Sequence, residues 1–134
     1  MYYSQLVGNP NDLPRIITSK DFVGLGAIQS DVYIPNQKGD EWYIEQSNFY
    51  RQVRNFIVDI RQTTTDKAAA FHWQVAQATS MTNVQIFASV DASTTQIGLF
   101  TENGSGGFMS DVFISGGKYG ICESGPAYLL LHPT

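Results

Sequence analysis

The chain has 134 residues, of which 43% are hydrophobic and 15% charged, and its formal net charge is −4. This composition can form the core of one domain and argues against disorder, and the lack of a basic run argues against a nucleic-acid partner. The single cysteine, Cys122, and the two histidines exclude a disulfide framework and a Cys-rich or His-rich metal cluster, so we expect neither metal nor cofactor. No apolar run is long enough to cross a bilayer, so we expect no membrane partner.

The N-terminal third predicts short strands separated by turns. Residues 1–7 read as a strand and lack the basic and long apolar regions of a signal peptide. A turn-rich segment follows at 8–14, then a short strand at 15–18, and a turn or excursion at 36–41. The run 31–34 has the same Asx–apolar–x–apolar form as later segments, and it predicts an earlier coil of the same structure.

The rest of the chain repeats with a period of 28 residues. The segments 53–59, 81–87 and 109–115 align without gaps, and a second run, 70–77, aligns at the same spacing with 98–105. Apolar residues alternate within each repeat with period two, which is strand periodicity. The clearest repeated columns are apolar Val53, Met81 and Met109, and the Asx residues Asn55, Asn83 and Asp111.

A strand-rich repeat of this length predicts a solenoid. Each coil would hold two or three short parallel strands, and coils would stack at about 4.8 Å. The Asx column would then form a polar ladder at one corner, where Asn and Asp suit a turn. The predicted fold is all-β, a partial parallel β-helix with uncapped ends that forms a single domain over residues 1–134.

Five strings of residues carry a resemblance to a known family. They lie, in this order, at 2–11, 24–33, 48–56, 72–80 and 102–111. Together they resemble the N-terminal β-helix of fungal exo-β-1,3-glucanases of glycoside hydrolase family 55, which have a pectate-lyase-like fold. The resemblance covers residues 1–120, and the tail at 121–134 diverges.

The resemblance implies a right-handed, single-stranded, pectin-lyase-like β-helix from a secreted, extracellular protein. Family members carry two tandem β-helices, and a β-1,3-glucan such as laminarin enters the cleft between them. Glucose is released from the non-reducing end with inversion, and the general acid is a Glu of the second β-helix. This chain would therefore be a fragment that supplies one wall of the cleft, partners a second β-helix domain, and lacks the general acid and activity of its own.

Inverting hydrolysis also needs a group that positions the attacking water. Gln77 and Ser105 are one period apart, so we expect them at the same corner of adjacent coils, and the resemblance makes them the water-positioning pair. Gln74 and Glu102 form the column three residues earlier, and we predict that both bind substrate. Ordinary turn hydrogen bonding for the first pair and a solvated surface carboxylate for Glu102 are the alternatives.

Aromatic residues near these columns suggest two further contacts. His72 and Trp73 are predicted to bind substrate by stacking on a pyranose, but neighbours in a strand point to opposite sides, so only one can line a cleft. Interior packing is the alternative for either residue. Ile57, Phe87 and Phe113 are expected to point outward in neighbouring columns, which predicts contact with another domain.

Two other functions stay open on the same fold. A pectate-lyase-type or polygalacturonase-type enzyme would use clustered Asp for calcium and an Arg base on an acidic polymer. Asp59 and Asp111 fall in different columns and the net charge is negative, which disfavours a polyanionic substrate. The other alternative is an inactive, truncated β-helix with at most a binding role.

Overall fold

The computed structural model describes residues 3–36, 39–123 and 128–131, apart from the side chains at 45, 75, 76, 105 and 128–131. Within these residues the structure consists of nine β-strands and one short 3-10 helix, with no α-helix. The elements are β1 (Gln5–Val7), β2 (Arg15–Ile17), β3 (Gly26–Gln29), η1 (Glu45–Ser47), β4 (Gln52–Asp59), β5 (Ala69–Gln77), β6 (Ser80–Phe87), β7 (Ile97–Ser115), β8 (Tyr119–Glu123) and β9 (Tyr128–Leu131). The described part of the chain holds no helix long and apolar enough to cross a membrane.

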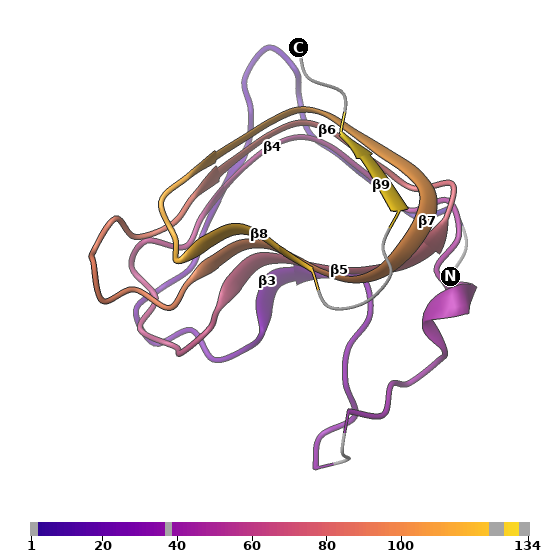
Figure 1. Cartoon of the computed structure of the whole chain (residues 1–134). Coiled ribbons are helices and arrows are strands. Elements are labelled where there is room, and N and C mark those ends of the chain that lie inside the picture. The colour runs from indigo at the N-terminus through magenta and orange to yellow at the C-terminus, as the bar shows by residue number, and fades with distance from the viewer. Residues whose placement is uncertain (1–2, 37–38, 124–127, 132–134) are drawn as a thin grey trace.

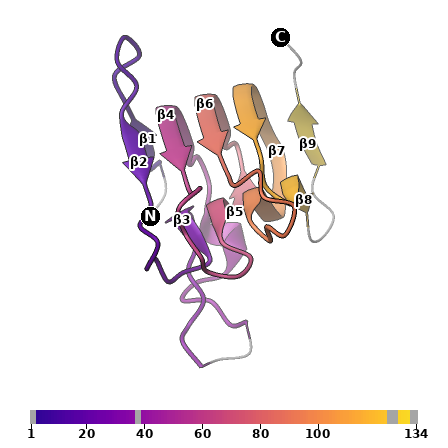
Figure 2. The ribbon, with the colours of Figure 1, turned by 90° about the vertical axis from the view of Figure 1, so that its left-hand side faces the viewer.

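The named strands pair in parallel as the chain winds around a common interior (Figure 1). On one side β1 and β2 pair with β4, β4 pairs with β6, and β6 pairs with the second part of β7. On the other side β3 pairs with β5, and β5 with the first part of β7, which then pairs with β8. Figure 2 shows β4, β6 and β7 side by side as successive layers. The expected all-β, parallel-strand architecture is confirmed.

The 28-residue period is the register of the sheet. Val53 lies opposite Met81, and Met81 lies opposite Met109. Phe71 lies opposite Leu99 in the second set of strands, as the weaker repeat predicted. Each coil therefore places like residues above one another, because parallel strands in register bring every period back to the same column.

The inward columns form one hydrophobic core. Val58, Met81, Ile86 and Phe71 are fully buried in it, and each such side chain contributes about 1.5–3 kcal/mol of transfer free energy. The equivalent residues at the ends of the described stack are more open. Leu6 is 39% exposed although it lies opposite Val53 at 3%.

The predicted Asx ladder is present at one corner. Asn55, Asn83 and Asp111 have positive φ values of 62°, 51° and 53°, a left-handed conformation that Asn and Asp tolerate better than most residues. The Asn83 side-chain amide donates to Asn55 Oδ1 at 2.9 Å, and the Asn55 amide donates to the Gly8 carbonyl at 3.1 Å. The corner is thus linked from coil to coil by its own side chains.

The prediction that 31–34 forms a coil strand is wrong. The place before β4 in the stack is held by β1 and β2, which both pair with β4. Residues 31–34 instead begin an excursion in which Tyr33 bridges Glu41 in antiparallel fashion. The cause is the buried Asp31 carboxylate, which accepts the Val32 N–H at 2.9 Å and the Asn48 amide at 2.8 Å. These bonds turn the chain away from the sheet, so the excursion extends from the stack in Figure 1.

Candidate functional site

The excursion, described at residues 30–36 and 39–50, covers the outer face of β5. Phe71 and Trp73 belong to the core, so the alternating residues His72 and Gln74 point to the opposite side of the strand. Both are nevertheless buried, at 0% and 4% exposure. An outward face that is this well covered marks the place where the excursion and the sheet meet.

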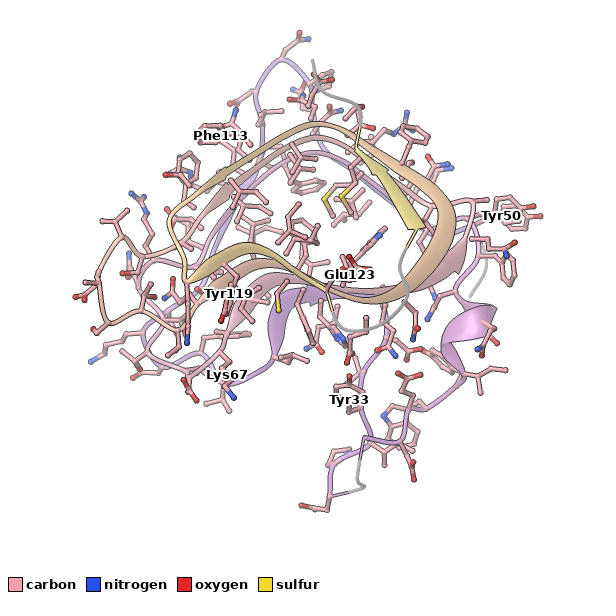
Figure 3. The ribbon with its side chains drawn as sticks, in the orientation of Figure 1. Tyr33, Tyr50, Lys67, Phe113, Tyr119 and Glu123 are labelled. Atoms are coloured by element: carbon pink, nitrogen blue, oxygen red, sulfur yellow. The ribbon has the colours of Figure 1, made fainter. Side chains whose placement is uncertain are left out.

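Glu102 joins the excursion to the sheet. One of its carboxylate oxygens, Oε2, lies 2.6 Å from His72 Nε2 and accepts a hydrogen bond from the Tyr33 hydroxyl. Burial of the Tyr33 phenol, followed by its hydrogen bond to Glu102, raises its pKa well above the usual value, because both effects disfavour the phenolate. Tyr33 therefore stays protonated and donating across the neutral pH range. Figure 3 shows Tyr33 below the strands, on the excursion side.

A second set of polar contacts holds the same interface. The Gln74 side-chain amide donates to Glu41 Oε1, and the Asn48 amide donates to the Gln74 carbonyl at 3.2 Å. Ser30 Oγ donates to that carbonyl at 2.7 Å. Within the described residues, His72 Nδ1 and Gln74 Oε1 are buried without a hydrogen-bond partner, which costs roughly 1–3 kcal/mol for each atom.

An open hollow lies beside these contacts. It has a volume of about 540 Å³ and is lined by excursion residues that include Asp40, Glu41 and Tyr43, and by Asn103 of β7. The lining mixes carboxylate and amide groups with an aromatic ring. Such a mixture can bind the hydroxyl groups and apolar faces of a sugar.

Gln77 and Ser105 meet at the next corner, as predicted. They are paired in the register of β5 and β7, and Gln77 is exposed at the end of its strand. The Gln77 carbonyl accepts the Tyr50 N–H at 3.1 Å. The Ser105 side chain lies outside the described residues, so its predicted contact with water stays a prediction.

Comparison with known proteins identifies the family to which this chain belongs. A family model described as rhamnogalacturonase A/epimerase, pectate lyase-like, matches residues 1–132. The chain belongs to this pectate-lyase-like family. The parallel strands, the 28-residue register and the polar corner ladder described above are therefore features of one of its members.

Curated relatives of this pectate-lyase-like chain carry two kinds of name. It is 49% identical over 120 residues to the non-secreted LysM effector LysM19 of Penicillium expansum, covering 89% of this chain and 9% of the relative. It is 43% identical over 122 residues to a probable glucan endo-1,3-beta-glucosidase of Arthroderma benhamiae, covering 89% and 14%. It is 38% identical over 121 residues to a glucan 1,3-beta-glucosidase of Cochliobolus carbonum, covering 90% and 15%. The resemblance to fungal β-1,3-glucanases is confirmed, and the chain spans only a small part of these relatives.

The predicted column of Gln74 and Glu102 is wrong. Trp73 lies opposite Thr101, but Gln74 lies opposite Asn103, so Glu102 is an extra residue on β7. Gln77 lies opposite Ser105, so the offset between β5 and β7 is again the one that holds before the extra residue. This bulge explains why Glu102 contacts His72 and Tyr33 rather than lying above Gln74, because an inserted residue re-aims its side chain.

Neither His72 nor Trp73 lines the hollow beside the excursion, although Trp73 borders a cavity of about 160 Å³ between β1, β3 and β4. Trp73 is 4% exposed and packs in the core. His72 lies between two rings, with centroids 5.4 Å from both Tyr33 and Phe100. The interior-packing alternative therefore holds for both residues in this structure, and the stacking role predicted for one of them has no exposed ring face to support it.

The outward columns on the far side of the stack form an aromatic and charged face. Phe113 is 55% exposed, and its ring centroid lies 6.0 Å from that of Phe87. The guanidinium group of Arg61 lies 5.5 Å from the Phe87 centroid and also pairs with Asp59 at 2.6 Å. The hydrogen bond from Arg61 holds the pKa of the Asp59 carboxyl below its usual value. Ile57 is half-buried beside them.

Sequence reasoning missed the contacts of two residues of the excursion. Tyr33 and Glu41 were assigned to a coil strand and a turn, yet both contact predicted site residues across the excursion. The usable signal was Asp31 itself, because Asn and Asp favour turns. No group of three or more His, Cys, Asp or Glu within the described ranges is placed to hold a metal ion.

Proposed function

We propose that this chain is part of a right-handed, single-stranded parallel β-helix from a glycoside hydrolase that cleaves β-1,3-glucan and releases glucose with inversion. Two relatives named as glucan 1,3-β-glucosidases, at 38% and 43% identity, support the substrate. The single observation that carries the proposal is the pairing of Gln77 with Ser105 at a corner where Gln77 is exposed. That pair supplies a side-chain amide and a serine on adjacent coils.

In this proposal Gln77 and Ser105 hold the attacking water. A side-chain amide can donate to a water and accept from it, so two polar groups from adjacent coils can fix its position. The general acid comes from a second β-helix, about 6.5–9.5 Å from the base side, to leave room for that water. The chain then forms one wall of the cleft and is inactive alone.

Gln74, His72 and Glu102 act on substrate indirectly in this proposal. Their contacts with Glu41 and Tyr33 fix the excursion, and excursion residues line the hollow of about 540 Å³. The sugar hydroxyls would be bound by the hollow itself. The three residues then affect substrate binding by holding its lining in place.

The outward face with Phe113 is the proposed contact for the second β-helix domain. An exposed aromatic ring beside Arg61 and Asp59 gives a partner both apolar and charged contacts. We also propose that the protein is extracellular. The name of one relative, a non-secreted effector, points the other way, so the presence of the natural protein in culture filtrate decides this.

The test is glucose release from laminarin by the natural protein that carries these residues. Gln77→Ala should lower kcat at least about 100-fold with little change in KM, because water positioning matters in the transition state. Val23→Ala is the control, since Val23 is 89% exposed between β2 and β3 and belongs neither to this corner nor to the face with Phe113. An unchanged kcat for Gln77→Ala would remove the water-positioning role. Glucose release by residues 1–134 alone would contradict the missing general acid.

A pectic substrate is the second candidate, because the matching family model names rhamnogalacturonase A and epimerase. The described residues argue against an acidic polymer at the Asp59 face, where the carboxylate is already paired with Arg61 and Arg15. Release of unsaturated uronides from polygalacturonate, followed by ultraviolet absorbance, would support a lyase. Release of reducing ends without that absorbance would support a hydrolase of the same polymer.

A further inference from the structure

A second corner of the stack carries a column of residues with positive φ. The column is Tyr3, Tyr50, Ala78 and Gly106, with φ values of 61°, 57°, 54° and 63°. Backbone hydrogen bonds link it from coil to coil: Tyr50 donates to the Gln77 carbonyl and Ala78 to the Gly106 carbonyl, both at 3.1 Å. The column therefore runs directly beside the Gln77–Ser105 corner.

The two tyrosines of this column are stacked in solvent. Their ring centroids are 4.6 Å apart with an interplanar angle of 7°, and Tyr3 and Tyr50 are 68% and 41% exposed. Figure 3 shows Tyr50 projecting away from the strands at this corner. A left-handed backbone is strained for a tyrosine, and rings this exposed recover little burial. Backbone strain at exposed residues that add little to stability indicates a functional role for these residues.

The stacked tyrosine rings end at Tyr50, because the next two positions of the column carry no large side chain. Ala78 and Gly106 hold the equivalent positions in the next two coils, and both are exposed. Among the described residues, a Cβ placed on Gly106 would meet no atom within 4 Å. Tyr3 covers one face of the Tyr50 ring, and the Phe49 ring lies tilted with its centroid 6.2 Å away, so the second Tyr50 face is directed toward the next coil, which carries Ala78. The space above Ala78 adjoins Gln77, the residue before Ala78 in the chain.

We propose that the Tyr3–Tyr50 stack is a sugar-binding platform on which one pyranose ring of a β-linked glucan lies. The equatorial substituents of β-glucopyranose leave its faces covered by C–H groups, and these suit the negative face of an aromatic ring. A ring on Tyr50 would occupy the space left by Ala78 and Gly106. The choice of β-1,3-glucan rests on the proposed function, whereas the platform rests on the stacked tyrosines.

The experiment measures binding of laminarihexaose to the full chain by calorimetry. Tyr50→Ala should weaken binding roughly tenfold, since it removes the ring face. Tyr50→Phe should stay within about twofold of the native chain, because stacking needs the ring and not the hydroxyl. Ala78→Tyr should weaken binding as strongly as Tyr50→Ala, because a new ring fills the space for the sugar.

Tyr119→Ala is the matched control, since Tyr119 is 49% exposed on β8 and lies away from Tyr50 in Figure 3. Its binding should be unchanged, and circular dichroism and Tm confirm that each variant is folded. Native binding by folded Tyr50→Ala and Ala78→Tyr would overturn the platform, as would failure of the native chain to bind any glucan.

Cellohexaose and oligogalacturonate separate the platform from the proposed function. If the native chain binds one of these and not laminarihexaose, and Tyr50→Ala loses that binding, the platform holds and the β-1,3-glucan assignment fails. If laminarihexaose binds equally to the native chain and to Tyr50→Ala, the platform fails and the β-1,3-glucan assignment stands.

Discussion

Two corners of this molecule share a backbone conformation and differ in their side chains. At one corner Asn55 and Asn83 bond each other and the Gly8 carbonyl. At the other Tyr3 and Tyr50 stack in solvent, followed by Ala78 and Gly106. The first corner uses residues that suit positive φ and link the coils, whereas the second keeps Tyr3, Tyr50 and Ala78, which do not suit it, and faces solvent. The difference separates a stabilising column from a proposed binding column.

Breaking the Asn ladder should have the largest effect on stability. Asn83→Val removes the bond to Asn55 Oδ1 and places a β-branched residue at a φ of 51°. The lost bond costs about 1 kcal/mol and the left-handed conformation about 1–2 kcal/mol more. Urea unfolding should show a loss of about 2–3 kcal/mol. Thr82→Val, one residue earlier in β6, is the control and should lose less than about 1 kcal/mol.

Releasing the excursion should disturb the tyrosine corner and spare the Asn corner. Tyr33→Phe removes a hydrogen bond to the Glu102 carboxylate, and bonds to charged groups are worth about 1.5–3 kcal/mol. Amide hydrogen exchange should rise in residues 30–50, which lead directly to Tyr50. Equal protection of these residues in the variant and the native chain would show that Glu102 does not hold the excursion.

The same contact predicts a dependence on alkaline pH. The folded state raises the pKa of Tyr33 above the ordinary value of a tyrosine, so its contribution to stability is complete below about pH 10. The contribution is lost as pH rises further, because the unfolded chain then releases a proton that the folded chain keeps. The stability difference between native and Tyr33→Phe should therefore shrink above about pH 10. A constant difference would contradict the raised pKa.

Relieving strain at the tyrosine corner should have the smallest effect. Ala78→Gly removes a Cβ at a φ of 54° and should stabilise the chain by about 0.5–1 kcal/mol, after the added freedom of glycine in the unfolded state. Thermal unfolding measures this change. Ala88→Gly, at a buried position in the core, is the contrast and should destabilise the chain.

The repeated columns could be predicted from the sequence, whereas the residues that interrupt the repeat could not. Val53, Met81 and Met109 stack as expected, because the 28-residue period matches the sheet register. The extra residue at Glu102 escaped notice because the register returns by Ser105, so a gapless alignment still fits on both sides. The Tyr3–Tyr50 stack was not predicted for a related reason, since the first coil does not keep the period of 28 residues.

The excursion that begins at residues 31–34 was the larger error of the sequence-based prediction. Residues 31–34 resemble a repeat strand in their local pattern, but the Asp31 carboxylate bonds the Val32 N–H and the distant Asn48 amide where the chain turns outward. The bond between Asp31 and Asn48 joins residues 17 positions apart, and local periodicity carries no information about it. The contact between Tyr33 and Glu102 is more distant still, and it depends on both the excursion and the bulge.

An NMR titration of the full chain with laminarihexaose tests the division between the two corners most directly. We predict chemical-shift changes in the Tyr50 ring and in the backbone amides of Gln77, Ala78 and Gly106, while the side-chain amide signals of Asn55 and Asn83 are unchanged. Shifts at the Asn ladder with none at Tyr50 would contradict the account.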